Sequence, residues 1–154
     1  MNMYDTYIFD LDGTLLSTLN DLAASCNYAL ENNGMPKRSI DEVRQFVGNG
    51  VKKLMERAIP DGLSNPLFDK TYQDFRQHYM KHNLDTTCPY DGVMDMLKEL
   101  HRRGKKVAVV SNKFYAATQD LCRHFFGEEL VPVAIGERED IRKKPAPDTV
   151  IEAL

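Results

Sequence analysis

The sequence predicts an α/β fold in which a parallel sheet carries a helical insertion after its first strand. A short apolar segment near the N-terminus, "YIFDLDGT", has the pattern of a buried strand. A long stretch with helical periodicity and helix-capping signals follows it, and strand and helix patterns then alternate to the end of the sequence. Because a single strand cannot form a sheet alone, we expect the first strand to pair with the later ones, which makes the helical stretch an insertion.

The first strand is expected over residues 5–11, which are too apolar on both faces for an exposed edge strand. The insertion, residues 16–85, opens with a helix that runs to about Asn32. Ser17 or Thr18 can cap the start of this helix, because a side-chain oxygen at that position accepts a backbone N–H of the first turn.

Three more helices are expected in the insertion. "SIDE", residues 39–42, has the pattern of a capping box, in which serine and glutamate each bind the other's backbone N–H. "GNG", residues 48–50, separates this helix from the next one. Asn65-Pro66 then offers an N-cap and a first-turn proline for a long helix that ends near Asn83. The insertion is most simply a cap over the sheet.

From Cys88 onward the pattern changes to alternating helices and strands. Such alternation indicates parallel strands joined by right-handed crossovers. The expected elements are a helix ended by Gly104, a strand over 106–112, a helix over 115–127, a strand over 130–136 and a helix after 145. The predicted domains are therefore a core of residues 1–15 and 86–154 and a helical cap of residues 16–85.

Composition and charge narrow the classes of function. A net charge of −3 and a pI near 5.8 give no electrostatic reason to expect nucleic acid or an anionic membrane as a partner. Neither a signal peptide nor a long apolar span is evident in the sequence. Cys26, Cys88 and Cys122 are too few and too scattered for a disulfide framework or a zinc cluster. We expect a cytoplasmic protein, and the sequence does not specify its oligomeric state.

Polar residues follow two of the predicted strands directly. Asp10 and Asp12 stand at the end of the first strand, and Ser111 and Asn112 stand at the end of the strand over 106–112. In open parallel sheets, ligands bind beyond the carboxyl ends of the strands. We therefore expect these four side chains to share one crevice.

Lys144 lies between the third strand and the last helix, from where a cation can reach the same crevice. Lys143, the residue before it, is the alternative. Gly13 allows the backbone to approach a ligand closely, and Thr14 adds a hydroxyl. Carboxylates beside a hydroxyl, an amide and an ammonium suit a phosphoryl group, with a divalent metal to reduce the repulsion between phosphate and carboxylate.

"DLDGT", a strand ending in "SN" and then "KPAPD" together resemble the haloacid dehalogenase superfamily. "FVGNG" and "PYDGV" resemble its phosphoglycolate phosphatase type, and the resemblance covers essentially the whole sequence. It implies a Rossmann-like parallel sheet core with an inserted α-helical cap. It also implies a Mg²⁺-dependent phosphoric monoester hydrolase that acts on a small phosphorylated metabolite, with phosphoglycolate as the first candidate.

The resemblance also implies a role for each site residue. Asp10 would be the nucleophile that forms an aspartyl phosphate, and Asp12 would be the general acid and base. An oxygen of Asp10 and the main-chain carbonyl of Asp12 would bind Mg²⁺. The acid at Asp12 favours phosphoester chemistry, because the family's dehalogenases lack one there. The residues implied to bind phosphate are Gly13, Thr14, Ser111, Asn112 and Lys144.

One expected motif is absent. The family's last acidic motif should follow the lysine, but the sequence stops ten residues after Lys144. We therefore expect a C-terminally truncated enzyme in which Asp10 holds Mg²⁺ weakly. Two alternatives stay open beside the phosphatase: a phosphomutase of the same superfamily, and an inactive fragment that binds phosphate without turnover.

Two further sequence motifs each allow two interpretations. The loop over residues 48–50 is either a helix break or a loop that contacts substrate with help from Arg44 or Lys52. His78 and His82 lie four residues apart on a predicted helix, either as ordinary surface residues or as a metal-binding pair.

Overall fold

The computed structural model describes residues 4–154 and divides into two compact units. The sheet unit contains the chain up to Ser17 together with Cys88–Leu154, and the helical unit is Thr18–Thr87. Within residues 4–154, no helix has both the length and the hydropathy that are needed to cross a bilayer.

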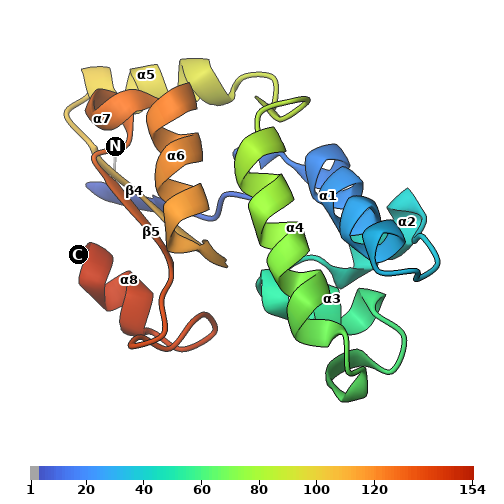
Figure 1. The fold of residues 1–154 in the computed structure, drawn as a ribbon. Helices are drawn as coiled ribbons and strands as arrows, with labels where there is room; N and C mark the ends of the chain where they lie inside the picture. The colour runs from blue at the N-terminus through green and yellow to red at the C-terminus, as the bar shows by residue number, and fades with distance from the viewer. Residues whose placement is uncertain (1–3) are drawn as a thin grey trace. The chain divides into compact units, whose positions relative to one another are not determined.

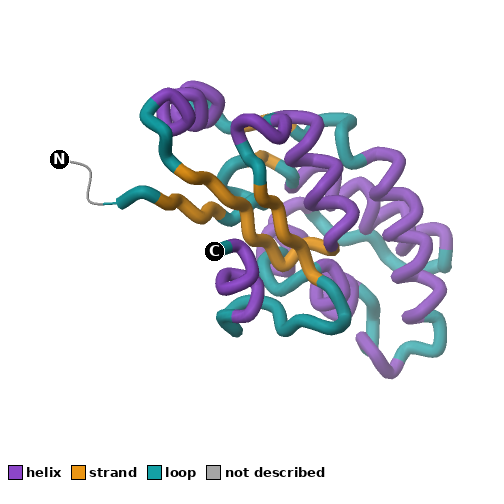
Figure 2. Tube along the Cα trace, turned by 90° about the vertical axis from the view of Figure 1, so that its left-hand side faces the viewer, coloured by secondary structure: helices purple, strands orange, loops and turns teal. Residues whose placement is uncertain are grey.

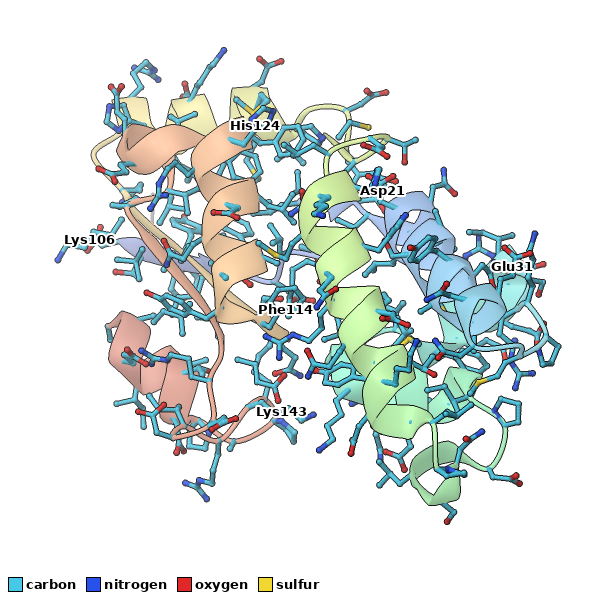
Figure 3. All side chains as sticks on the ribbon, viewed as in Figure 1. Asp21, Glu31, Lys106, Phe114, His124 and Lys143 are labelled. Atoms are coloured by element: carbon cyan, nitrogen blue, oxygen red, sulfur yellow. The ribbon has the colours of Figure 1, made fainter. Side chains whose placement is uncertain are left out.

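The sheet unit is built on three parallel strands in the order β1-β4-β5 (Figures 1 and 2). They are β1 (Thr6–Phe9), β4 (Lys106–Phe114) and β5 (Val133–Glu137). Lys106 and Phe114 mark the two ends of β4 in Figure 3. The predicted α/β fold with a parallel sheet is confirmed.

The central strand β4 is buried from Val107 to Phe114 because helices cover the sheet. Val107 and Val109 belong to the core cluster, to which α5 (Val93–Arg102) and α6 (Tyr115–Phe125) contribute. The short helix α7 (Gly127–Leu130) packs against α5 and α6, and α8 (Asp148–Ala153) contacts β4 and β5 without joining the cluster. Burial on both faces explains why Val107–Val110 in β4 form a continuous apolar run.

The expectation that the first strand is not at an edge is wrong for the described part of the chain. Among residues 4–154, β1 pairs with β4 alone, and Tyr7, Ile8 and Phe9 are half-buried. Apolar composition reports how the faces of a strand pack, whereas edge pairing depends on backbone groups that every sequence offers.

A small antiparallel pair was not predicted. It joins β2 (Leu16–Ser17) to β3 (Cys88–Pro89), with Leu16 opposite Pro89, at the two points where the chain leaves and re-enters the sheet unit. Two-residue strands are too short for any periodicity to reveal them.

The helical unit contains four α-helices and a short 3₁₀-helix among its described residues. They are α1 (Leu19–Asn32), α2 (Ile40–Phe46), α3 (Val51–Ala58), η1 (Gly62–Ser64) and α4 (Phe68–His82). Helices α1 and α4 pack along each other. The capping box is confirmed, because Ser39 Oγ accepts the Glu42 N–H at 3.1 Å and Glu42 Oε1 accepts the Ser39 N–H at 3.0 Å.

The predicted start of the long helix is two residues too early, because Leu67 and not Asn65 is the N-cap. Asn65 Oδ1 accepts the Leu67 N–H at 2.9 Å, and the Asn65 carbonyl accepts the Phe68 N–H at 3.0 Å. Asparagine here forms an Asx turn that precedes the helix, which is a common alternative to capping it.

A buried carboxylate ties the two ends of the helical unit together. Asp21, in the first turn of α1 and labelled in Figure 3, is only 3% exposed. Its carboxylate accepts the N–H groups of Thr86 and Thr87 at 2.9 Å each and their hydroxyls at 2.7 and 2.8 Å. Burial raises the pKa of Asp21, but these hydrogen bonds outweigh it and hold the pKa below its ordinary value.

Candidate active site

An exposed carboxylate and a lysine meet at the end of β1. Asp10 directly follows the strand, and Lys144 lies in the loop between β5 and α8. Lys144 Nζ is 3.0 Å from Asp10 Oδ1 and donates to the Val110 carbonyl at 2.8 Å. Lys143 Nζ instead lies 4.0 Å from Glu137 Oε1. The structure thus places Lys144, of the two lysines considered, beside Asp10.

Asn112 binds the backbone of Lys144 rather than its side chain. Asn112 Oδ1 accepts the Lys144 N–H at 2.9 Å, and Asn112 Nδ2 donates to the Lys144 carbonyl at 3.2 Å. The Lys144–Pro145 peptide bond is cis. The amide implied to hold phosphate therefore also fixes the loop that presents Lys144.

The end of β4 departs from regular strand pairing at the predicted site residues. Val110 lies opposite Ile135, but the next paired residues are Phe114 and Glu137, so residues 111–113 form a bulge. Ser111 is 3% exposed, and its Oγ accepts the Lys113 N–H at 3.1 Å. A hydroxyl can still donate its own hydrogen, so Ser111 keeps a donor for a ligand.

Gly136 on β5 lies against this bulge. A Cβ atom at Gly136 would lie 2.6 Å from Tyr115 Cα, 2.7 Å from the Lys113 carbonyl oxygen and 2.7 Å from Thr118 Oγ1. Real Cβ atoms do not approach other atoms so closely, so the bulge can pack here only because residue 136 has no side chain.

Asp12 forms an ion pair with Lys113, a residue that the sequence analysis missed. Lys113 Nζ is 3.0 Å from Asp12 Oδ1, with the Lys113 side chain 1% and the Asp12 side chain 16% exposed. A signal was present: Lys113 interrupts the apolar segment "KVAVVSNKF", and a buried lysine is very costly unless an opposite charge pairs with it.

The loop after β1 is a tight turn that carries Asp12. The Leu11 carbonyl accepts the N–H groups of Thr14, Leu15 and Leu16 at 3.0–3.1 Å, and the Gly13 N–H donates to the Leu16 carbonyl at 2.9 Å. Gly13 has φ +76°, a left-handed conformation that favours glycine. Gly13 and Thr14 are exposed, and the Gly13 amide is used within the loop.

The site thus pairs two carboxylates with two lysines. Lys144 faces Asp10 where solvent reaches both, whereas Lys113 faces Asp12 from inside the fold. Burial and the charge of Asp12 raise the pKa of the nearby Cys122 thiol to about 12, so this thiol stays neutral. An exposed carboxylate beside an ammonium can attack an electrophile whose negative charge the ammonium stabilises.

The donors present are of the kind that Mg²⁺ prefers. The Asp10 carboxylate and the Asp12 main-chain carbonyl both offer hard oxygen atoms. Within residues 4–154, no cluster of three or more histidine, cysteine, aspartate or glutamate side chains is suited to a metal ion.

The histidine pair is not arranged for a metal. The rings of His78 and His82 stack with centroids 4.2 Å apart and 21° between their planes. His78 Nδ1 is 2.8 Å from Ser25 Oγ, and His82 Nδ1 is 2.8 Å from Asp85 Oδ2. Nitrogen lone pairs lie in the ring planes, so those of nearly parallel rings do not converge on one ion.

The glycine loop over residues 48–50 separates α2 from α3, and an arginine fixes it. Arg57 donates to the Phe46 carbonyl and to Asn49 Oδ1, both at 3.0 Å. Arg44, considered as a substrate contact, pairs with Asp41. The contact of this loop with substrate stays a prediction.

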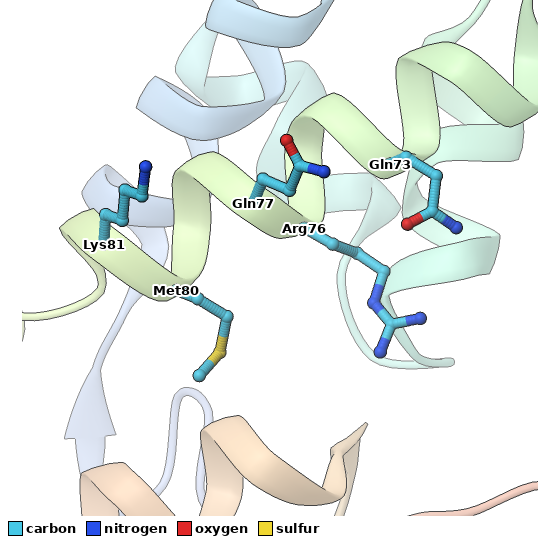
Figure 4. Close-up of a pocket in the computed structure, with 5 residues that line it drawn as sticks. All are labelled: Gln73, Arg76, Gln77, Met80 and Lys81. Carbon is cyan, nitrogen blue, oxygen red and sulfur yellow. The ribbon is translucent and has the colours of Figure 1, made fainter.

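A hollow on the helical unit follows one face of α4. Figure 4 shows that all the labelled side chains lining it come from this helix. They are Gln73, Arg76, Gln77, Met80 and Lys81. None of them is among the predicted site residues.

A family model and several relatives of known name match most of this chain. The family model for haloacid dehalogenase-like hydrolases matches residues 7–154. The phosphoglycolate phosphatase of Aquifex aeolicus is 30% identical over 96% of this chain and 67% of its own length. That of Chromobacterium violaceum is 36% identical over 90% of this chain and 64% of its own length.

A solved structure agrees with these matches. The crystal structure of a predicted phosphoglycolate phosphatase from Haemophilus somnus has a TM-score of 0.89 and 30% identity, and the match covers 96% of this chain and 68% of that one. The chain therefore spans about two thirds of the length of the relatives it matches.

Proposed function

Because the chain belongs to the haloacid dehalogenase-like hydrolase family, we propose that it hydrolyses small phosphate monoesters through an aspartyl phosphate on Asp10. The observation that carries this proposal is the exposed Asp10 carboxylate with Lys144 Nζ 3.0 Å away. Phosphoglycolate is the first substrate to test, because relatives that match most of the chain carry that name.

Four residues of the site, Asp10, Asp12, Ser111 and Lys144, have a part in the proposed reaction. An oxygen of Asp10 attacks phosphorus, the bond from phosphorus to the ester oxygen breaks, and Asp12 gives its proton to the departing oxygen. Water then attacks the aspartyl phosphate and gives a proton back to Asp12, which releases inorganic phosphate and restores Asp10. Lys144 and the Ser111 hydroxyl stabilise the negative charge on the phosphoryl oxygens.

The oxygen donors of Asp10 and Asp12 suit a divalent ion. Mg²⁺ would be held by the Asp10 carboxylate and the Asp12 carbonyl, and it would reduce the repulsion between the nucleophile and the phosphate. The three free cysteines support a reducing compartment, and we place the activity in the cytoplasm.

The first experiment is phosphate release from p-nitrophenyl phosphate by this chain, with and without Mg²⁺. We expect Mg²⁺-dependent release that Asp10→Asn abolishes while the circular dichroism spectrum stays unchanged. Asp69→Asn, at an exposed aspartate in the first turn of α4, is the matched control and should keep full activity. Activity of Asp10→Asn within about tenfold of the parent would remove Asp10 from the nucleophile role.

Two alternative functions have distinct outcomes in the same assays. A phosphomutase would convert one sugar phosphate isomer to another faster than it releases phosphate. A phosphate-binding fragment without turnover would bind inorganic phosphate or vanadate in calorimetry and release nothing from any ester. Phosphate release from phosphoglycolate in preference to sugar phosphates would support the phosphatase.

A further inference from the structure

Lys113 differs from Lys144 in what can reach it. The side chain of Lys144 is 29% exposed, so a ligand can touch its ammonium. The side chain of Lys113 is 1% exposed, and its ammonium faces Asp12 at 3.0 Å. The contact with Asp12 therefore offers a route by which the buried Lys113 can act on a bound phosphate ester.

The fold fixes the backbone of Lys113 from several directions. Its N–H donates to Ser111 Oγ at 3.1 Å, and its carbonyl accepts the Thr118 hydroxyl at 3.3 Å. Gly136 packs so closely that an added Cβ would lie 2.7 Å from the same carbonyl oxygen. Lys113 thus has a fixed backbone at the irregular end of β4, and its buried side chain carries a charge that needs the opposite charge of Asp12.

We propose that Lys113 is a positioning residue for Asp12: its ammonium group contacts Asp12 Oδ1 and so orients the carboxyl group, whose other oxygen, Oδ2, carries the proton that passes to the departing ester oxygen. The inference rests on the proposed phosphatase function and assigns a role to a residue beyond those already placed in the reaction. Replacing Lys113 leaves the Asp12 carboxyl group chemically unchanged but removes the contact that holds it in position.

The identity of the leaving group separates this role from a merely structural one. An alkoxide is a poor leaving group and needs the proton of Asp12 as it departs, whereas p-nitrophenolate departs readily without it. A general loss of folding or of phosphate binding lowers the rates of both kinds of ester equally. Misplacement of Asp12 lowers the rate of the alkyl ester more.

The experiment compares kcat/KM of the parent and of Lys113→Met on p-nitrophenyl phosphate and on phosphoglycolate, with Mg²⁺ present. This parameter covers every step through departure of the leaving group, so it isolates the proton transfer from later hydrolysis of the aspartyl phosphate. We expect the loss on phosphoglycolate to exceed the loss on p-nitrophenyl phosphate by about tenfold or more. Asp12→Asn should show the same selectivity.

Two further variants complete the design. Lys106→Met carries the same substitution at the exposed start of the same strand, and it should leave both rates unchanged. Lys113→Gln replaces Lys113→Met if circular dichroism shows the latter to be unfolded, because glutamine keeps a hydrogen-bond donor without the charge.

The possible results distinguish failure of the positioning role of Lys113 from failure of the phosphatase function. Equal losses on both esters, or no loss on either, would overturn the positioning role and leave the phosphatase function standing. No release from either ester by the parent would overturn the phosphatase function and, with it, this inference.

Discussion

The strongest prediction for stability concerns Asp21, which joins the two ends of the helical unit. Its carboxylate accepts hydrogen bonds from four donors, the N–H and hydroxyl groups of Thr86 and Thr87. At roughly 1 kcal/mol for each donor that loses its acceptor, Asp21→Ala should lower the free energy of unfolding by about 4 kcal/mol. Asp21→Asn keeps one acceptor oxygen and should cost about 2 kcal/mol. These are large fractions of the stability of an ordinary domain.

The contribution of Asp21 to the free energy of unfolding should decrease as the pH falls into the acidic range. The pKa of Asp21 is lowered in the folded chain from its ordinary value of 3.8, because the hydrogen bonds favour the ionised form more than burial disfavours it. Its contribution to stability is therefore complete above about pH 5 and is lost as the pH falls through the folded pKa. The difference between parent and Asp21→Asn should be constant near neutral pH and should narrow below about pH 4.

Urea unfolding followed by circular dichroism measures both effects. The control is Asp69→Asn, an exposed first-turn aspartate in α4, which should change the free energy of unfolding by less than about 0.5 kcal/mol. A cost for Asp21→Asn equal to that of the control would refute the reasoning. A difference in unfolding free energy between parent and Asp21→Asn that stays constant down to pH 3 would also refute it. The hydrogen bonds to Asp21 would then not depend on the charge of its carboxylate.

Three further predictions test other features. Gly136→Ala should destabilise the chain by about 1–3 kcal/mol, because its Cβ would meet Tyr115 Cα, and an unchanged melting temperature would contradict this. Asn112→Ala should speed hydrogen exchange at the Lys144 amide by about tenfold, and retained protection would show that another group holds the loop. Ser39→Ala should cost about 1 kcal/mol in urea unfolding through loss of the capping box, and a change near zero would rule that out.

Local features of this chain were predictable because their causes lie within a few residues. The Ser39 capping box needs a partner only three positions away, and the apolar run of β4 reports its own burial. The positions of Asp10 and Lys144 near the carboxyl ends of the strands follow from the general geometry of parallel sheets.

Other features depend on contacts between distant parts of the sequence and were missed for that reason. Asn112 pairs with a residue 32 positions away, and no pattern shows that its amide binds the backbone there. Lys113 pairs with Asp12, which is far away in the sequence, at the irregular end of β4. The open edge of β1 likewise depends on which strands pair and not on its own composition.

The contact between Asn112 and Lys144 has a consequence for how this site can be altered. Because Asn112 binds the N–H and the carbonyl of residue 144, these two contacts do not depend on the side chain that stands there. Lys144→Ala should leave the loop where it is and expose a vacancy bordered by the Asp10 carboxylate and the Val110 carbonyl. A small alkylammonium ion supplied in the buffer can then take the place of the missing ammonium, so the position is suited to chemical rescue.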